Sequence, residues 1–103
     1  MALPSLTPEQ RQAALEKAAV ARKKRAELKK SLKAGEVRLS DVLELAQTDE
    51  VIAKLRVSAL LESMPGIGIA KARAIMDRTS ISSSRRVGGL GPHQRAALIS
   101  IFC

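Results

Sequence analysis

Residues 57–68 read VSALLESMPGIG, and residues 69–78 continue as IAKARAIMDR. Before the glycines, apolar residues recur at the i, i+3, i+4, i+7 spacing of an amphipathic helix, namely Val57, Leu60, Leu61 and Met64. After the glycines, apolar residues again lie at helical spacing, namely Ile69, Ala72, Ile75 and Met76. A short glycine turn between two packed helices is therefore the element on which the predicted fold depends.

The turn holds two glycines, Gly66 and Gly68, on either side of Ile67, which we expect to plug the turn into the core. Glycine adopts positive φ without steric cost. The turn amides can therefore point outward at the N-terminal end of the next helix, whose partial positive charge favours an anion. Lys71 and Arg73 follow in that helix and can reach the same phosphate chain. The pattern resembles the helix-hairpin-helix class of nucleic-acid modules, although an ordinary tight turn between helices has the same glycines.

Helix signals cover most of the remaining chain. Thr7 and Gln10 form a capping box with Pro8 at the first helical position, which predicts one long helix from Glu9 to about Ala34, ended by Gly35. Shorter helices are expected after a Ser40-Asp41 cap, over residues 50–56 and 92–102, and no segment alternates like a strand. We expect an all-α fold in two parts, residues 1–39 as a basic helix with a flexible start and residues 40–103 as a compact body.

The balance of charge indicates a polyanionic partner. The 103 residues carry 18 Lys and Arg against 10 Asp and Glu, a net charge of +8, and two basic ends flank a net acidic segment over residues 36–65. A small protein this basic attracts nucleic acid or an anionic membrane surface. Phe102 is the only aromatic residue, so the chain lacks stacking platforms for single-stranded bases. We expect contact with the phosphates of a duplex.

Two more groups of basic residues are candidate phosphate contacts. The first is a run of consecutive residues whose side chains point in every direction around the long helix, namely Arg22, Lys23, Lys24 and Arg25. The second is Arg85 and Arg86, which follow three serines. If Ser84 caps a short helix there, both guanidinium groups leave from its first turn, toward phosphates or a narrow minor groove. The alternative for this pair is a solvated surface position.

A second glycine turn echoes the first. Gly89-Leu90-Gly91 can be laid on Gly66-Ile67-Gly68 at an offset of 23 residues, with apolar residues following both turns at similar positions. A match of this length also arises by chance. If the repeat is real, it supplies two phosphate seats with the arginine pair between them.

Residues 57–68, the Arg85-Arg86-Val87 and Gly89-Leu90-Gly91 segments, and the opening from Ala2-Leu3-Pro4 to Leu15-Glu16-Lys17-Ala18-Ala19 carry a family resemblance. Together they resemble the actinobacterial, mycobacterial-type integration host factors, in the same order and over most of the chain. The heterodimeric integration host factor of other bacteria, a strand-rich fold, does not resemble this chain.

The resemblance implies a long N-terminal helix joined to a helix-two-turns-helix DNA-binding body. It implies a nucleoid-associated protein that binds duplex DNA with little sequence preference, bends it, and acts as host cofactor in phage site-specific recombination, meeting integrase complexes on shared DNA. We also expect the protein to be a monomer. By position, the family's backbone-gripping turn falls on Gly66 and Gly68 with Lys71 after them, its arginine pair on Arg85 and Arg86, and its basic helix on residues 22–25.

The chain departs from the family pattern at two positions. Ile69 stands where the family often has Lys, and Gly88 stands where a basic residue commonly follows the arginine pair. Both departures remove charge from the expected contact surface.

Two other functions have sequence requirements that can be compared with this chain. A ribosomal-protein-like binder of structured RNA would use the same phosphate contacts. A glycosylase-lyase would need a nucleophilic amine and an acid in a pocket, and neither the Met1-Ala2-Leu3-Pro4 start nor the residues after Gly66 supply them. His93 has no partner at metal-ligand spacing, and Cys103 is a single, incidental cysteine that suits a reducing cytoplasm. With no apolar run near the roughly 18 residues that span a bilayer, we expect a cytoplasmic protein that is not an enzyme and has no metal, cofactor or membrane partner.

Overall fold

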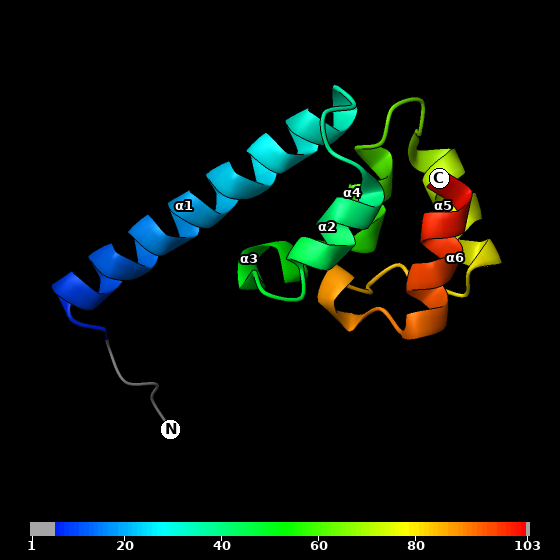
Figure 1. Cartoon of the computed structure of the whole chain (residues 1–103). Helices are drawn as coiled ribbons and strands as arrows, with labels where there is room; N and C mark the ends of the chain where they lie inside the picture. Colours follow the sequence, from blue (N-terminus) through cyan, green and yellow to red (C-terminus); the bar gives the residue numbers. More distant parts are fainter. Residues whose placement is uncertain (1–5, 103) are drawn as a thin grey trace.

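A computed structural model describes residues 6–102, so the expected flexible start and Cys103 lie outside the described residues. The described chain is all-α, as predicted. Its elements, in chain order, are α1 (Pro8–Lys33), α2 (Leu39–Leu45), α3 (Glu50–Ala53), α4 (Val57–Glu62), α5 (Ile69–Arg78), the 3-10 turn η1 (Val87–Gly89) and α6 (Pro92–Phe102). Figure 1 shows α1 as a long rod at one side of a cluster formed by the shorter helices.

The ends of α1 follow the signals in the sequence. The Thr7 side chain accepts the backbone N–H of Gln10 at 3.1 Å, and the Gln10 side chain accepts the backbone N–H of Thr7 at 3.0 Å. Both bonds satisfy amides that have no partner inside the helix. After α1, Gly35 has a φ of 75°, the left-handed conformation that favours glycine. The predicted capping box and glycine stop are confirmed.

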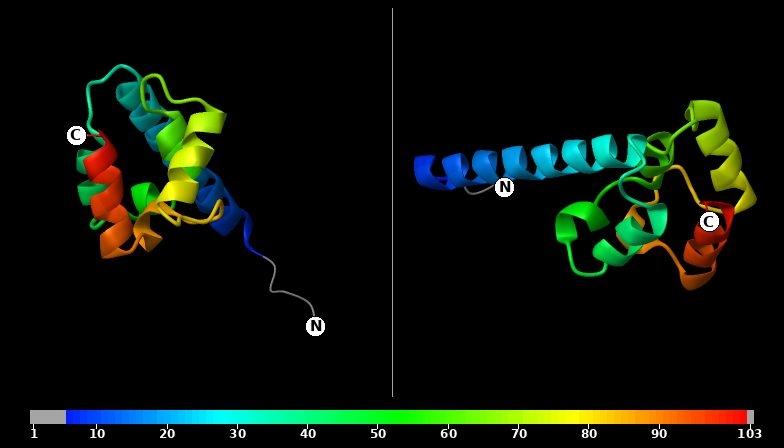
Figure 2. Two further views of the ribbon diagram at one scale, coloured as in Figure 1. Left: turned by 90° about the vertical axis from the view of Figure 1, so that its right-hand side faces the viewer. Right: turned by 45° about the horizontal axis from the view of Figure 1, so that its top comes forward.

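Only the C-terminal half of α1 packs against the other helices. Leu32 is fully buried and Leu28 packs against the core, whereas Leu15 and Val20 are 59% and 65% exposed. The views in Figures 1 and 2 agree that the N-terminal half extends away from the rest of the molecule. The division of the chain at residues 39 and 40 stays a prediction, and Leu32 shows that the long helix contributes to the core.

One apolar core joins the shorter helices. Its fully buried members are contributed by α2, α4 and α6 as well as α1, namely Leu32, Leu39, Val42, Val57, Leu60, Leu61 and Leu98. The one buried polar side chain among the described residues, Ser63, donates its hydroxyl to the carbonyl of Ala59 at 2.7 Å, so its burial leaves no unpaired hydrogen-bonding group. This core fixes both ends of α4, where the candidate site lies.

Two predicted helix boundaries were wrong. The second helix begins at Leu39, and Asp41 caps it from inside the first turn by accepting the backbone N–H of Arg38 at 3.1 Å. The third helix ends at Ala53 instead of residue 56. It is shorter because Arg56 adopts extended backbone and pairs with Arg86 in an isolated antiparallel bridge. Tertiary pairing thus overrides the local helix propensity of residues 54–56.

Candidate nucleic-acid interface

The glycine turn between α4 and α5 has the conformation that an anion seat needs. Gly66 is exposed with a φ of 75°, and a Cβ placed on it would meet nothing within 4 Å, so backbone conformation explains the glycine. Gly68 is the N-cap of α5 and provides no side-chain cap. The first amides of α5 therefore have no side-chain acceptor and face an exposed turn, where a phosphate can bind them. Ile67 packs against the core, as predicted.

The predicted cations of α5 lie beside this turn. Lys71 and Arg73 are exposed in the first and second turns of the helix, and Asp77 is the only acidic residue in α5. Ile69, at the family's frequent Lys position, is 70% exposed. Here the contact surface presents an apolar side chain directly after the second glycine.

A second cationic site is an open hollow between α1 and the α3–α4 link. It is lined by Leu55 and Ala59 and by five basic side chains, namely Arg25, Lys29, Lys54, Arg56 and Arg86. No acidic residue lines the hollow. Arg25 and Arg86 were predicted contacts that the fold brings together here, whereas Lys29, Lys54 and Arg56 were missed by the sequence analysis.

Backbone pairing explains why Arg56 and Arg86 lie opposite each other. Val57 N–H donates to the Arg85 carbonyl at 3.0 Å, and Val87 N–H donates to the Leu55 carbonyl at 2.8 Å. These two bonds lie on either side of Arg56 and Arg86. The two arginines therefore form a non-hydrogen-bonded antiparallel pair, the type in which the two side chains lie closer together and on the same face. Like charges in such a pair destabilise each other. An anion in the hollow, which both side chains line, would therefore offset this repulsion.

Further hydrogen bonds hold the arginine pair in place. Arg86 Nη1 donates to the Lys54 carbonyl at 2.6 Å, and Arg85 Nη1 donates to the Gly89 carbonyl at 2.9 Å. The predicted Ser84 cap was wrong, because η1 begins only at Val87 and its N-cap, Arg86, makes no side-chain cap bond. The arginines thus leave from an extended segment instead of a helical turn.

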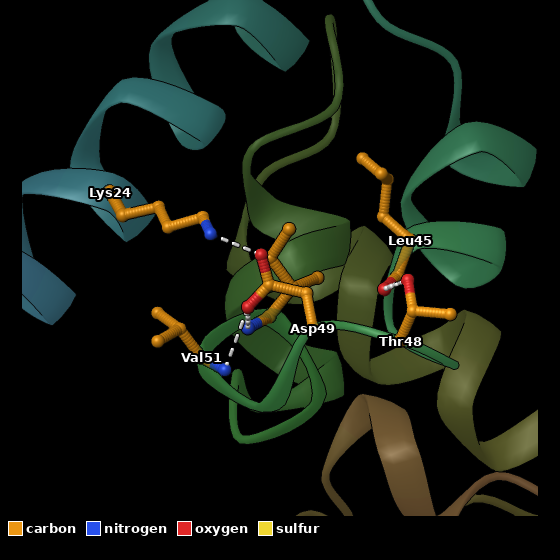
Figure 3. Close-up of polar contacts among 6 residues, drawn as sticks. Lys24, Leu45, Thr48, Asp49 and Val51 are labelled. Carbon is orange, nitrogen blue, oxygen red and sulfur yellow. Dashed lines mark hydrogen bonds and ion pairs between the residues drawn. The ribbon is translucent and has the colours of Figure 1, made fainter.

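The basic run in α1 divides between two roles. Lys24 forms an ion pair with Asp49, which also caps α3 by accepting the backbone N–H of Val51 at 3.0 Å (Figure 3). The hydrogen bond from Lys24 is the main cause that lowers the pKa of Asp49 below its ordinary value. Arg25 is partly buried at the hollow, whereas Arg22 and Lys23 are exposed. Lys24 therefore ties α1 to the body.

The second glycine turn does not repeat the conformation of the first. Among residues 6–102 the glycines with positive φ are Gly35 and Gly66, so Gly89 lacks the left-handed backbone of its counterpart. The Gly91 N–H also has an internal partner, since it donates to Gln94 Oε1 at 2.9 Å. The expected structural echo was wrong at Gly89, although Gly68 and Gly91 both directly precede a helix.

Gly88 has a packing reason to be glycine. A Cβ at this position would lie 2.8 Å from the Ala53 Cβ and 3.2 Å from the Ala53 carbonyl oxygen. Both are rigid parts of α3, so a longer residue would force α3 and η1 apart. The basic residue common in the family at this position is therefore excluded by the close contact in this chain.

Two candidate contact regions, the hollow and the glycine turn, lie at opposite ends of α4. Arg56 and the hollow lie at the start of α4, and the turn with Gly66 and Gly68 follows its end. At ~1.5 Å per residue α4 is about 9 Å long. Lys33 strengthens this frame by donating from Nζ to the Glu62 carbonyl at 3.2 Å. A single helix thus spaces the two candidate phosphate-binding regions.

No helix within residues 6–102 has the length and apolar character needed to cross a membrane. The same residues contain no group of three or more His, Cys, Asp or Glu side chains arranged to hold a metal ion.

Comparison with known proteins places this geometry in context. The S13-like H2TH domain family matches residues 32–102. The chain is 58% identical over 98 residues to the integration host factor of Streptomyces coelicolor, covering 95% of this chain and 92% of that protein. It is 56% identical over 102 residues to the integration host factor of Mycobacterium tuberculosis, covering 99% of this chain and 97% of that protein.

A solved structure is also similar. It is the structure of sIHF bound to an 8-bp palindromic DNA, with a TM-score of 0.84 and 51% sequence identity. The similarity covers 85% of this chain and 99% of that chain. Sequence and structure comparisons therefore point to the same relatives.

Proposed function

We propose that this chain, which belongs to the actinobacterial family of integration host factors built on an S13-like H2TH domain, binds double-stranded DNA and bends it. Its family membership also supports the expectation that it is not an enzyme. Association with the nucleoid in the cytoplasm, and service as a host cofactor in phage recombination through DNA shared with an integrase, are the finer parts of this proposal.

The observation that carries the proposal is the hollow with five cations and no acidic residue. In such a site Lys and Arg neutralise phosphates and release condensed counterions, which favours binding without reading sequence. The glycine turn adds backbone amides at the start of α5, beside Lys71 and Arg73. The site residues proposed for DNA are therefore Arg22, Lys23, Lys24, Arg25, Gly66, Gly68, Lys71, Arg73, Arg85 and Arg86, extended by Lys29, Lys54 and Arg56. Among these, Lys24 must exchange Asp49 for a phosphate.

Bending needs contacts beyond the two ends of α4. The hollow and the glycine turn are separated by a helix about 9 Å long, which corresponds to fewer than three base pairs of a duplex. Bending a short duplex costs on the order of 1–6 kcal/mol, which added contacts can offset. The 26-residue α1 extends the contact surface, and its exposed half can follow the duplex beyond the body.

The experiment that tests the proposal is a titration of a random-sequence duplex at several salt concentrations. Five hollow cations plus Lys71 and Arg73, at roughly 0.9 per phosphate, give an expected log–log slope of about −6. Fluorescence transfer between the duplex ends reports bending in the same samples. A log–log slope near zero contradicts phosphate-driven binding. Unchanged fluorescence transfer at saturation contradicts bending.

Structured RNA is the competing partner to include. A folded RNA offers phosphates but in A-form geometry, with a shallow minor groove and 2′-hydroxyls. We expect duplex DNA to displace RNA from the protein at equal phosphate concentration. Preferential retention of RNA would assign the phosphate-binding regions to RNA instead.

A further inference from the structure

We propose that the cationic hollow also binds the phosphate chain of a small soluble oligophosphate, such as the triphosphate part of a nucleotide. The hollow is the site already described by Arg25, Lys29, Lys54, Arg56 and Arg86. Binding of a soluble ligand goes beyond DNA binding. Only the consequence for DNA competition rests on the proposed function.

The first support is uncompensated charge. Within residues 6–102 the single ion pair is Lys24–Asp49, and neither of these residues lines the hollow. The five cations of the hollow therefore have no acidic partner in the described structure. A cluster of like charges lowers its electrostatic energy when a compact anion enters it.

The second support is that two of the five basic side chains, Arg25 and Arg86, are restricted in position without a ligand. The backbone bridge sets Arg56 against Arg86, and the Lys54 carbonyl orients the Arg86 guanidinium at 2.6 Å. Arg25 is partly buried and so is restricted in its conformations. Groups that are already positioned lose less conformational entropy on binding, which strengthens binding of a small ligand.

The third support is the match of charge density. A phosphate monoester carries about −1.5 to −2 charges at neutral pH, so one such group leaves most of the hollow unmatched. One DNA strand carries a single charge per about 3.4 Å of helix axis, on a backbone that the hollow contacts from one side. An oligophosphate concentrates several charges within a few bonds and can meet cations from both α1 and the α3–α4 link.

The lining of the hollow has no means of recognising a base attached to the phosphates. Leu55 and Ala59 complete the hollow, and no aromatic side chain lines it. A base would find no stacking platform. The hollow is therefore expected to bind the phosphate groups and to tolerate different organic groups attached to them. Inorganic tripolyphosphate, which has no organic group, is the suitable probe.

Occupancy by this ligand has a consequence for DNA. All five cations of the hollow are also proposed DNA contacts, so a bound oligophosphate and a DNA phosphate compete for them. The glycine turn and Lys71 are not part of the hollow and stay accessible. A soluble oligophosphate is thus expected to weaken DNA binding in part and to reduce bending.

The test is calorimetric titration of the full chain with inorganic tripolyphosphate at fixed salt. The site variant is Lys29→Gln/Arg56→Gln, whose side chains make no hydrogen bond or ion pair in the described structure. The control is Lys17→Gln/Arg78→Gln, which removes the same charge from exposed positions outside the hollow. Thermal melts of each variant check folding, and Lys54→Gln alone serves if the double variant unfolds.

We expect one saturable site in the wild type, a loss of at least tenfold in affinity in the site variant, and less than a twofold change in the control. Equal weakening in both double variants, or a wild-type titration that does not saturate, overturns the proposal. Duplex titrations with the same variants separate the two functions. Loss of duplex affinity with unchanged tripolyphosphate binding overturns the oligophosphate site alone, whereas the reverse result overturns the hollow as a DNA contact.

Discussion

Gly66→Asp is the sharpest single test of the glycine turn, with Gly66→Asn as its matched control. Gly66 has a φ of 75° and no atom within 4 Å of an added Cβ, so both side chains have room. Asn and Asp are also the non-glycine residues that best tolerate left-handed backbone, and both variants should lose a similar amount of folding free energy, about 1 kcal/mol. The two variants then differ by one negative charge at the proposed phosphate seat.

The size of the difference follows from the distance to a bound phosphate. Two unit charges about 4 Å apart interact by about 1 kcal/mol in water and about 4 kcal/mol near a protein surface of effective dielectric 20. Gly66 is exposed, so the lower part of this range applies. We expect the Asp variant to bind a random duplex about tenfold more weakly than the Asn variant, which corresponds to about 1.4 kcal/mol.

Fluorescence anisotropy of a labelled duplex measures both affinities, with thermal melts as the check on folding. The difference should shrink as salt rises, because salt screens the added repulsion. Equal duplex affinity of the Asp and Asn variants, with matching melting temperatures, would refute the assignment of the turn as a phosphate seat.

Three further predictions concern the frame around the site. Leu32→Ala should lower the free energy of unfolding, measured by urea titration, by about 2–5 kcal/mol because Leu32 is fully buried. Leu15→Ala, on the projecting part of α1, should change the free energy of unfolding little. Equal losses in the two variants would contradict the packing of α1. Asp49→Asn keeps a capping oxygen for α3 but removes the ion pair to α1. The ion pair lowers the pKa of Asp49, so the stabilisation from the pair is present above the ordinary pKa of 3.8 and is lost as pH falls through the lowered pKa. The melting temperatures of wild type and variant should therefore converge in acid. A difference in melting temperature that stays constant with pH would count against the pair. Gly88→Ala should lower the free energy of unfolding by about 1–3 kcal/mol through overpacking. Because the added Cβ would lie 2.8 Å from the Ala53 methyl group, Ala53→Gly should recover part of that loss in a double-mutant cycle. Strict additivity of the two substitutions would contradict the clash.

Local signals predicted much of the fold. The capping box at Thr7, the glycine stop at Gly35 and the helix over residues 69–78 are set by neighbours within one or two turns, and the structure confirms all three. Of the four apolar positions predicted in that helix, only Ile69 is exposed. Each of the three features depends on hydrogen bonds or packing faces that a short window of sequence contains.

The hollow was harder to predict because it is made by distant segments. Lys54 and Arg56 lie in the part of the chain with net negative charge, so a count of charge by segment assigned that part no contact role. The pairing of Arg56 with Arg86 depends on backbone bonds between segments that no periodicity connects. The local signals for this site were the basic run that contains Arg25 and the arginine pair that contains Arg86, and the expected serine cap of the pair was wrong.

The bridge between Arg56 and Arg86 has a consequence for how the protein acquires its binding surface. Residues so far apart in sequence meet only after the intervening α4 and α5 have closed a long loop, a step that carries an entropic cost and that core packing must offset. A nascent or partly unfolded chain has the same net charge of +8 but no assembled hollow. Tight, saturable anion capture should therefore appear with the cooperative folding transition, which would make it a reporter of native chain in a mixture of folded and unfolded molecules.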